Sequence, residues 1–599
     1  MHYSQRRLEN RVATDTRPES GRVDEDRVRS ITSMLKRRGI IRPAFEDYGG
    51  VTGLYDFGPV GGRLLRRVQE AWRDHWLSLG NIVEIDSPTI TPSEVLEASG
   101  HVGAFNDHAT ECLACGHLDR SDRLLVHHVD NPGSLTAGDL DAGLAEHAVK
   151  CPSCGETGWS PSKPMNLMFP TTIGPVGDGR SAFMRPETAQ GMFTSYPSLY
   201  RHFRQRLPFG AVQIGKGYRN EISPRQGMIR LREFNMAELE YFIDPESTER
   251  RDLTDWDEHE FSLVPDSAGG FPEPLQSTVS GAVEAGIIRH PTVAWMMAHS
   301  ATLLHDLGVD PSRLRFRQHE ADEMAHYATD CWDLELHGSY GWIECVGIAH
   351  RGCYDLQAQE SATDSREYRA WRRADRPRRL TTEIIAPIAS VIGPYFKGKA
   401  KAVLAALADL EELPASLPFQ LELADGGSVQ MTGEMVQRKN VEMTVDGEWY
   451  TPHVVEPAFG LDRIIWHLLD HAFVEAEREG ETYATLRLSE LVAPYECAIL
   501  PLHKKGEMVD LANAVFGRVC ALRGVQGYID QFGKSIGRRY ARADEIGVPW
   551  AITIDQQSLR DDTATVRRRD DHAQIRAPID HILSALSQSD VASLFPTQS

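Results

Sequence analysis

The 599-residue sequence lacks any apolar run of the roughly 18 residues that a membrane-spanning helix needs. Its first 27 residues are polar, without the apolar segment of a secretory signal. We therefore expect a cytoplasmic protein that does not enter a membrane. The chain is too long for one hydrophobic core, so we expect about three to four domains.

Basic residues are in the minority. The sequence holds 64 lysines and arginines against 86 aspartates and glutamates, a formal net charge of −22. This balance argues against a general nucleic-acid coat, although a local basic groove for RNA is compatible with it. A salt-rich cytoplasm would screen such charge, a hypothesis that full activity and a compact fold in low-salt buffer would contradict.

The two common phosphate-binding glycine motifs are absent. The glycine-rich run at 49–62, GGVTGLYDFGPVGG, has neither GxGxxG spacing after a strand nor a GxxxxGK[ST] sequence, so it indicates tight turns and close packing. The following segment, RLLRRVQEAWRDHWLSLG, predicts an amphipathic helix. Its apolar stripe consists of Leu64, Leu65, Val68, Trp72 and Trp76.

Cysteine is scarce, but four of the nine cysteines form two CxxC pairs. Each CxxC turn directs two sulfurs toward one tetrahedral ion, so the pairs predict a four-thiolate zinc site. Because the protein fills all four positions, this zinc would be structural. The ligands are Cys112, Cys115, Cys151 and Cys154, and we expect His117 to be a surface imidazole.

The segment at 218–242, YRNEISPRQGMIRLREFNMAELEYF, carries charges where a buried strand would carry apolar side chains. It predicts a hairpin of two strands, YRNEI and RLREFNMAELEYF, around the turn SPRQG. Arginine side chains can bind phosphate groups, and an aromatic ring can stack on a nucleotide base. Carboxylates can accept hydrogen bonds from an exocyclic amine or an ammonium group. The hairpin therefore has the side chains that a nucleotide-binding site needs. The alternative is a solvated edge hairpin with surface ion pairs. Side chains two apart share a face, which groups Arg219 with Glu221, and Arg232 with Phe234, Glu238 and Glu240.

Three more charged positions are candidates for binding. Glu187 in RPETAQG could bind a ligand or simply open a helix. Arg463 in EPAFGLDR opposes the dipole of its helix, so either an anion recruits it or it pairs with Asp462 or Glu456. Glu344 in the apolar strand YGWIECVG needs an arginine or a metal ion as partner.

Strands and helices alternate from about Val492, which predicts a separate C-terminal α/β domain with parallel strands. The basic stretches at 533–547 and 566–576 fit recognition of phosphate and single-stranded bases. The alternative is that these arginines pair with neighbouring aspartates and glutamates.

Taken in order, these motifs resemble the class II aminoacyl-tRNA synthetases and, in detail, the homodimeric type of glycyl-tRNA synthetase. The similarity runs from about residue 42 to about residue 585. Its motifs are YGGVTGLYDFGPVG, TPSEVLEASGHV, RPETAQGMF, the segment at 218–242, MAHYATDCWD, SYGWIECVGIAHR, EPAFGLDR and SIGRRYARADEIG.

The resemblance implies an α+β fold: an antiparallel six-stranded catalytic sheet with flanking helices, a zinc-binding insertion and a C-terminal α/β anticodon-binding domain. It also implies a homodimer with an interface near residues 80–92, at Pro92 or Pro88. The expected boundaries are a flexible tail at 1–25, a catalytic domain at 26–490 with insertions at 106–165, 245–310 and 395–450, and the anticodon-binding domain at 491–599.

The implied reaction joins ATP and glycine to glycyl adenylate, releasing pyrophosphate, and then transfers glycine to tRNA(Gly), releasing AMP. Arg219 would hold the α-phosphate, Glu221 would read the adenine amino group, and Arg463 would take one adenine face and the γ-phosphate; these three are the expected catalytic residues. Phe234 would stack on the adenine. The remaining implied roles are Mg²⁺ binding by Glu344, and binding of the glycine ammonium by Glu187, Glu238 and Glu456.

One position departs from the family pattern. The family has serine in EPSFG where this chain has Ala458, and the missing hydrogen bond to the substrate would be worth about 1 kcal/mol. Two other readings are a non-catalytic nucleic-acid-binding relative and a class II ligase for another small amino acid. Retention of the nucleotide-binding arginines disfavours the first, and RPETAQG with the three carboxylates disfavours the second.

Overall fold

The computed structural model describes residues 23–596, with gaps at 127, 130–131, 176–177, 225–226, 248–251, 267–273, 321–328, 409, 411–415, 479–480 and 505. The predicted N-terminal tail lies outside the described residues up to position 22. So do the first half of MAHYATDCWD and two residues of the SPRQG turn. The chain forms two compact units, of which residues 369–451 make up the smaller.

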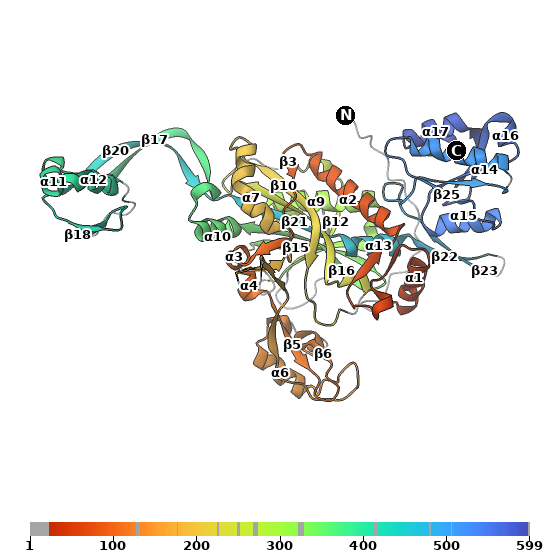
Figure 1. The fold of residues 1–599 in the computed structure, drawn as a ribbon, viewed down its shortest axis with the longest axis horizontal. Helices are drawn as coiled ribbons and strands as arrows, with labels where there is room; N and C mark the ends of the chain where they lie inside the picture. Colours follow the sequence, from red (N-terminus) through yellow and green to blue (C-terminus); the bar gives the residue numbers. More distant parts are fainter. Residues whose placement is uncertain are drawn as a thin grey trace. The chain divides into compact units, whose positions relative to one another are not determined.

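A nine-stranded sheet carries the core of the larger unit (Figure 1), in the order β13-β12-β14-β15-β16-β21-β11-β10-β3. The six neighbours from β14 to β10 are antiparallel, which confirms the expected catalytic sheet. β3 and β12 join its edges in parallel. The bounds are β3 Ile82–Glu84, β10 Phe209–Tyr218, β11 Glu233–Ile243, β12 Phe261–Val264, β13 Leu275–Ser277, β14 Leu314–Gln318, β15 Asp330–Gly338, β16 Gly341–Gly352 and β21 His453–Gly460.

The helices divide between the two faces of this sheet. Helices α1 Glu25–Arg37, α2 Gly61–Leu77, α9 Pro291–Leu307 and α13 Leu461–Ala472 contribute to the main hydrophobic core. The predicted stripe of α2 is confirmed, because four of its members are at most 1% exposed and Leu65 packs against them. Helix α7 Ala189–His202 lies against the other face, where the ring of Tyr196 is 5.0 Å from that of Phe242.

Strand β11 alternates between these two environments. Ala237, Leu239 and Tyr241 are buried in the main core. The even-numbered residues therefore point to the other face of the sheet, and they include Glu238 and Glu240. This alternation places the charged side chains predicted from the sequence on one surface.

The first arm of the predicted hairpin is wrong. Strand β10 ends at Tyr218, opposite Glu233, so only the first residue of YRNEI lies in a strand and the other four belong to the connection to β11. The ladder stops because the backbone N–H of Asn220 donates to the carbonyl of Leu167 (2.7 Å) and no longer to β11. Ser223, with a φ of 52°, turns the chain further away.

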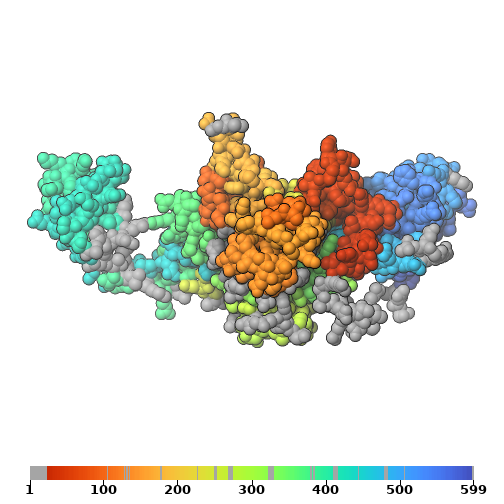
Figure 2. Space-filling model, turned by 90° about the horizontal axis from the view of Figure 1, so that it is seen from below, coloured from red at the N-terminus to blue at the C-terminus, as the bar shows by residue number. Residues whose placement is uncertain are grey.

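The insertion with the CxxC pairs is a small sheet and two short helices, drawn in orange in Figures 1 and 2. Its strands have the order β6-β5-β7. It has a hydrophobic core of its own, formed by Leu125, Leu140, Leu144 and Val149. The bounds are β5 Asn106–Glu111, β6 Leu118–Arg120, α5 Ser121–Leu125, α6 Ala137–Glu146 and β7 Lys163–Asn166.

The smaller unit, residues 369–451, begins before the insertion expected at 395–450. Its two long strands pair antiparallel, β17 Ala370–Pro387 with β20 Val436–Tyr450. Between them lie α11 Ala389–Phe396, α12 Ala400–Ala408, β18 Phe419–Glu422 and β19 Ser428–Met431. Apolar residues of these elements form a separate core.

The C-terminal region contains a five-stranded sheet in the order β25-β24-β26-β27-β28 and its own hydrophobic core. The first three strands are parallel, as predicted, whereas the last two are antiparallel. The bounds are β24 Cys497–Pro501, α14 Gly506–Cys520, β25 Gly527–Ile529, α15 Ile536–Glu545, β26 Trp550–Ile554, β27 Thr563–Arg568, β28 Gln574–Pro578 and α17 Ile579–Ser587. Across the described residues, no helix combines the length and the apolar character needed to cross a membrane.

Candidate active site

An open pocket of about 750 Å³ lies on the charged face of the sheet. Its lining comes from β11, β16, β21, the start of α13 and the loop at 219–232. It brings together seven of the residues predicted from the sequence, although they are far apart along the chain. These are Arg219, Glu221, Phe234, Glu238, Glu344, Ala458 and Arg463.

Arg219 lies beside aromatic rings at one end of this pocket. Its guanidinium carbon is 5.5 Å from the ring centroid of Phe234 and 5.2 Å from that of Phe105. Its Nε donates to the carbonyl of Pro186 at 3.4 Å, a long hydrogen bond. The guanidinium is therefore oriented chiefly by ring contacts, and most of its N–H groups are left to face an anion.

Arg463 pairs with Glu344 across the pocket. Its Nη1 donates to Glu344 Oε2 (3.1 Å) and to the Glu344 carbonyl (2.7 Å), and its Nε donates to the carbonyl of Ile229 (3.1 Å). The alternative pairings with Asp462 or Glu456 are therefore not observed. Partial loss of water around its half-exposed carboxylate would raise the pKa of Glu344, but the Arg463 guanidinium outweighs this and lowers that pKa.

Asp462 instead fixes the start of α13 to β11. Its carboxylate accepts hydrogen bonds from the backbone N–H and from Nδ2 of Asn235, the latter at 2.8 Å. Burial raises the pKa of Asp462 to about 6. This anchor places Arg463, the next residue, over the pocket.

Glu221 and the arginines that follow it have different roles. Glu221 Oε2 lies 3.7 Å from Nε of Arg230, which also lines the pocket and was not predicted from the sequence. Arg232 was expected on the binding face, and that expectation is wrong. Its guanidinium donates to the carbonyls of Thr52 (2.6 Å) and Glu221 (3.0 Å), so it supports the loop.

At Glu238 the pocket adjoins a group of carboxylates, the acidic end of the site, whose other members Glu187 and Glu456 do not line the pocket itself. Glu238 Oε2 accepts hydrogen bonds from Thr188, from the backbone N–H at 2.8 Å and from the hydroxyl. Glu456 Oε2 accepts from Nη1 of Arg351 (2.7 Å). Arg351 is itself held by both carboxylate oxygens of Asp355. Fixed donors thus hold both glutamates in place.

Glu187 precedes α7 and has a histidine beside it. Its Oε1 lies 3.5 Å from Nε2 of His101 and accepts from Nε2 of Gln190 (3.2 Å). Burial raises the pKa of Glu187, but the charge of His101 outweighs it and the net shift is downward. Glu187 is therefore ionised at neutral pH.

The carboxyl groups of the acidic end are too close together for all of them to ionise. Burial, together with the charges of Glu456 and Glu187, raises the pKa of Glu238 to about 8. A cation that enters between these carboxylates relieves their mutual repulsion. A small ammonium fits this chemistry, since its N–H groups can donate to several carboxylates at once.

The four cysteines of the CxxC pairs converge on one point. The Cys112–Cys154 and Cys115–Cys151 sulfurs are each 3.7 Å apart, and all four lie within 4.8 Å of one another. A tetrahedral ion with Zn–S bonds of about 2.3 Å needs sulfurs about 3.8 Å apart, so the thiols fit zinc. The Nε2 atom of His117 lies 3.3 Å from Oδ2 of Asp119, and His117 is not one of the four converging residues.

Two further arginines near the sheet have a structural role. Arg315 and Arg317 on β14 form ion pairs with Glu335 (2.6 Å) and Asp333 (2.8 Å) on the neighbouring strand β15. Arg315 also lies over the ring of Trp342. Both guanidinium groups are therefore engaged within the sheet.

The C-terminal arginines are also largely engaged within the protein. Arg539 is 3% exposed and donates to three backbone carbonyls. Arg567 forms two hydrogen bonds of 2.9 Å with Asp544. Arg569 donates to the carbonyls of Gly547 and Leu488. For these residues ion pairing and backbone bonding replace the predicted RNA contacts.

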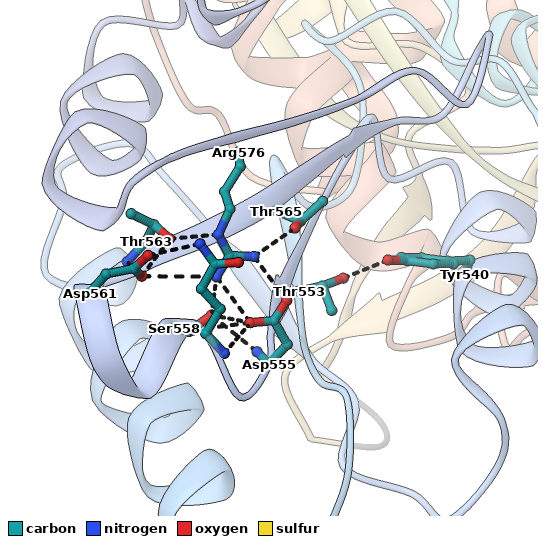
Figure 3. Close-up of polar contacts among 9 residues, drawn as sticks. Tyr540, Thr553, Asp555, Ser558, Asp561, Thr563, Thr565 and Arg576 are labelled. Carbon is teal, nitrogen blue, oxygen red and sulfur yellow. Dashed lines mark hydrogen bonds and ion pairs between the residues drawn. The ribbon is translucent and has the colours of Figure 1, made fainter.

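Figure 3 shows that Arg576, on β28, is also engaged within the protein. Arg576 forms two hydrogen bonds with Asp555 (2.9 and 3.0 Å) and also donates to Thr563. The hydroxyl of Tyr540, the tyrosine of the basic stretch at 533–547, hydrogen-bonds with Thr553 (2.6 Å). Phe532 is 72% exposed, with exposed cations at Lys534 and Arg538 in the same segment and at Lys504, which lies beside Gly533.

Sequence reasoning did not single out Arg351, Asp355 or His101. Arg351 lies in the quoted motif SYGWIECVGIAHR and His101 in TPSEVLEASGHV, so the motifs contained them. Their roles depend on partners brought close by the fold: Glu456 is 105 positions from Arg351.

The comparisons with known proteins agree with this geometry. A family model described as an anticodon binding domain matches residues 496–589. The glycine--tRNA ligase of Methanothrix thermoacetophila is 42% identical, covering 94% of this chain and 96% of its own. That of Methanocaldococcus jannaschii is 40% identical, covering 94% and 99%.

A third such ligase, from Archaeoglobus fulgidus, is 41% identical and covers 93% of this chain and 96% of its own. A solved structure, Giardia lamblia prolyl-tRNA synthetase in complex with prolyl-adenylate, is 13% identical with a TM-score of 0.49, covering 96% of this chain and 81% of that one. Identity of this extent with the curated ligases places the chain in the glycine--tRNA ligase family of class II aminoacyl-tRNA synthetases.

Proposed function

We propose that the chain joins glycine to tRNA(Gly). ATP and glycine react to glycyl adenylate with release of pyrophosphate, and glycine then passes to the terminal ribose of the tRNA with release of AMP. The observation that supports this reaction best is the pairing of two adjoining sites. The arginine-aromatic pocket suits ATP, the carboxylate group beside it suits an ammonium, and strand β11 contributes to both through Phe234 and Glu238.

At the ATP end, catalysis rests on position and charge. Arg219 holds the α-phosphate, where negative charge develops during adenylate formation. Phe234 and Arg463 hold the two faces of the adenine, with Arg463 also near the γ-phosphate, and Glu221 accepts from the adenine amino group. No protein nucleophile is required, because the glycine carboxylate attacks a phosphate held in line.

Two metal ions belong to this proposal. Glu344 presents a half-exposed carboxylate at the pocket, which suits Mg²⁺ bound together with the phosphates of ATP. Mg²⁺ would neutralise phosphate charge when bound. Zinc would be held by Cys112, Cys115, Cys151 and Cys154 and would have a structural role, since four protein ligands leave no position for water.

At the acidic end, Glu187, Glu238 and Glu456 hold the glycine ammonium. Glycine offers no side chain to bind, so selection depends on excluding larger amino acids by lack of space. Ala458 lies directly opposite Glu238 in the sheet and lines the pocket. Without the family's serine hydroxyl, the carboxylates carry more of the recognition.

We propose that tRNA binds to the exposed part of the C-terminal domain around Phe532. The ring can stack on an unpaired base, and Lys504, Lys534 and Arg538 can meet phosphates. We further propose a homodimer with an interface near residues 80–92, at Pro92 or Pro88, and a cytoplasmic location. The resemblance to the homodimeric synthetases supports the dimer.

Amino-acid-dependent ATP-pyrophosphate exchange tests the proposed reaction. The expected result is exchange with glycine and not with alanine or serine. Exchange with alanine or serine instead would identify a ligase for another small amino acid. Absence of exchange with every amino acid would identify a non-catalytic relative.

A further inference from the structure

Glu240 is a buried carboxyl group that the reaction described above does not use. It lies two residues beyond Glu238 on the same face of β11 and is 0% exposed. Neither of its carboxyl oxygens has a hydrogen-bond partner among the described residues. An ionised carboxylate in such a place would carry a large desolvation penalty without compensation.

The strand register places Glu240 against a second carboxyl group. Glu238 pairs with Ala458 and Tyr241 with Val455, so the register between them puts Glu240 opposite Glu456. Carboxyl oxygens of Glu238, Glu240 and Glu456 all lie within 4.8 Å of one another. Two facing buried carboxyl groups do not both ionise, so one of them keeps a proton.

The hydrogen bonds indicate which group of this facing pair keeps it. Glu456 accepts from the charged guanidinium of Arg351, which favours its ionised form. Glu240 has no such donor. On β10 its neighbour across the ladder is Ala211, whose side chain cannot donate.

We propose that Glu240 keeps its proton in the folded protein and donates it in a hydrogen bond to Glu456. Glu240 is then a positioning residue for the ammonium pocket: it holds Glu456 between Arg351 and the substrate without adding a charge. The substrate role assigned here rests on the proposed function.

The charged groups facing Glu240 come from four elements: Glu456 on β21, Arg351 on β16, Glu238 on β11 itself and Asp355 on α10 (Tyr354–Thr363). Arg351 is bound by both Asp355 and Glu456, so it is not free to neutralise a further carboxylate. Burial, with the charge of Glu456 next, raises the pKa of Glu240 well above its ordinary value.

Two variants of the full chain separate the possible states of Glu240. Glu240→Gln keeps a hydrogen-bond donor and never ionises, whereas Glu240→Met keeps the volume but has no donor. In glycine-dependent exchange we expect Glu240→Met to raise the KM for glycine about tenfold with little change in the KM for ATP. Glu240→Gln should stay within about threefold of the wild type.

Two results of this experiment would overturn the proposal. If Glu240→Gln raises the KM for glycine as much as Glu240→Met, the pocket needs a negative charge at this position. If Glu240→Met behaves as the wild type, the donor has no role. Failure of the wild type to exchange with glycine would instead contradict the proposed function.

Thermal melting across pH tests the proton itself without any substrate. The unfolded chain releases the Glu240 proton near pH 4.5, whereas the folded chain keeps it to higher pH, so the wild type loses stability as pH rises through this interval. Glu240→Gln does not titrate, so its melting temperature relative to the wild type should rise steadily from pH 5 to pH 8. A constant or shrinking difference would mean that Glu240 is ionised in the folded protein.

Discussion

Ala458 lines the pocket opposite Glu238, where the family pattern has serine. We expect Ala458→Ser to restore a hydrogen bond to the substrate worth about 1 kcal/mol, which corresponds to a roughly fivefold lower KM for glycine. Steady-state exchange at saturating ATP measures this change. An unchanged KM would show that the hydroxyl is not needed in this chain.

Single residues differ in how far the sequence predicts them. Arg219, Phe234 and Glu344 could be recognised because charged and aromatic side chains stand in strand-like or motif contexts. Arg232 had the same appearance, yet it binds the carbonyls of Thr52 and Glu221. Only the fold decides whether an arginine faces a cavity or a neighbouring carbonyl.

The link between α13 and β11 depends on a buried aspartate. The pKa of Asp462 is about 6 in the folded protein against 3.8 ordinarily, so the folded state holds a proton that the unfolded chain has lost. The stability contributed by this proton is complete below about pH 3.8 and disappears as pH rises through 6. A shift of this size corresponds to at most about 3 kcal/mol.

Asp462→Asn removes this titration. Relative to the wild type, we therefore expect the variant to gain stability between pH 4 and pH 7. The measurement is the difference in melting temperature between the two proteins at each pH. The same difference at both pH values would contradict a raised pKa at Asp462.

The CxxC insertion should depend on its metal ion. We expect about one zinc per chain by elemental analysis, and loss of that zinc in Cys151→Ser, because a three-thiolate site binds zinc more weakly. Ser153→Ala, within the same turn, is the matched control and should retain zinc. A full zinc content in Cys151→Ser would contradict the four-thiolate site.

At the level of elements, regular patterns were predictable and long-range pairings were not. The stripe of α2 follows from its 3.6-residue period, and its members are buried as predicted. The end of β10 depends on Asn220 bonding to Leu167, more than 50 positions earlier in the chain. No local pattern contains that information, so YRNEI resembled a strand.

At the level of the whole molecule, the proposed function assigns adenylate formation to the catalytic sheet and tRNA binding to the region at 496–589 that matches an anticodon binding domain. Phe532→Ala should therefore lower kcat/KM for tRNA charging about tenfold through loss of one base-stacking contact. Glycine-dependent exchange should stay unchanged. The control is Tyr395→Ala, which removes an exposed ring from the smaller unit. Equal losses in charging and exchange would place Phe532 outside tRNA recognition.

The central claim is that ATP binds in the arginine-aromatic pocket and glycine at the carboxylates beside it, both built on β11 and its neighbours. The most direct test compares Arg219→Ala and Glu238→Ala in glycine-dependent ATP-pyrophosphate exchange. We predict that Arg219→Ala lowers the exchange rate at least about 100-fold with an intact fold. Glu238→Ala should raise the KM for glycine about tenfold or more while the KM for ATP changes little. Equal effects of Glu238→Ala on both KM values, or an active Arg219→Ala enzyme, would contradict the account.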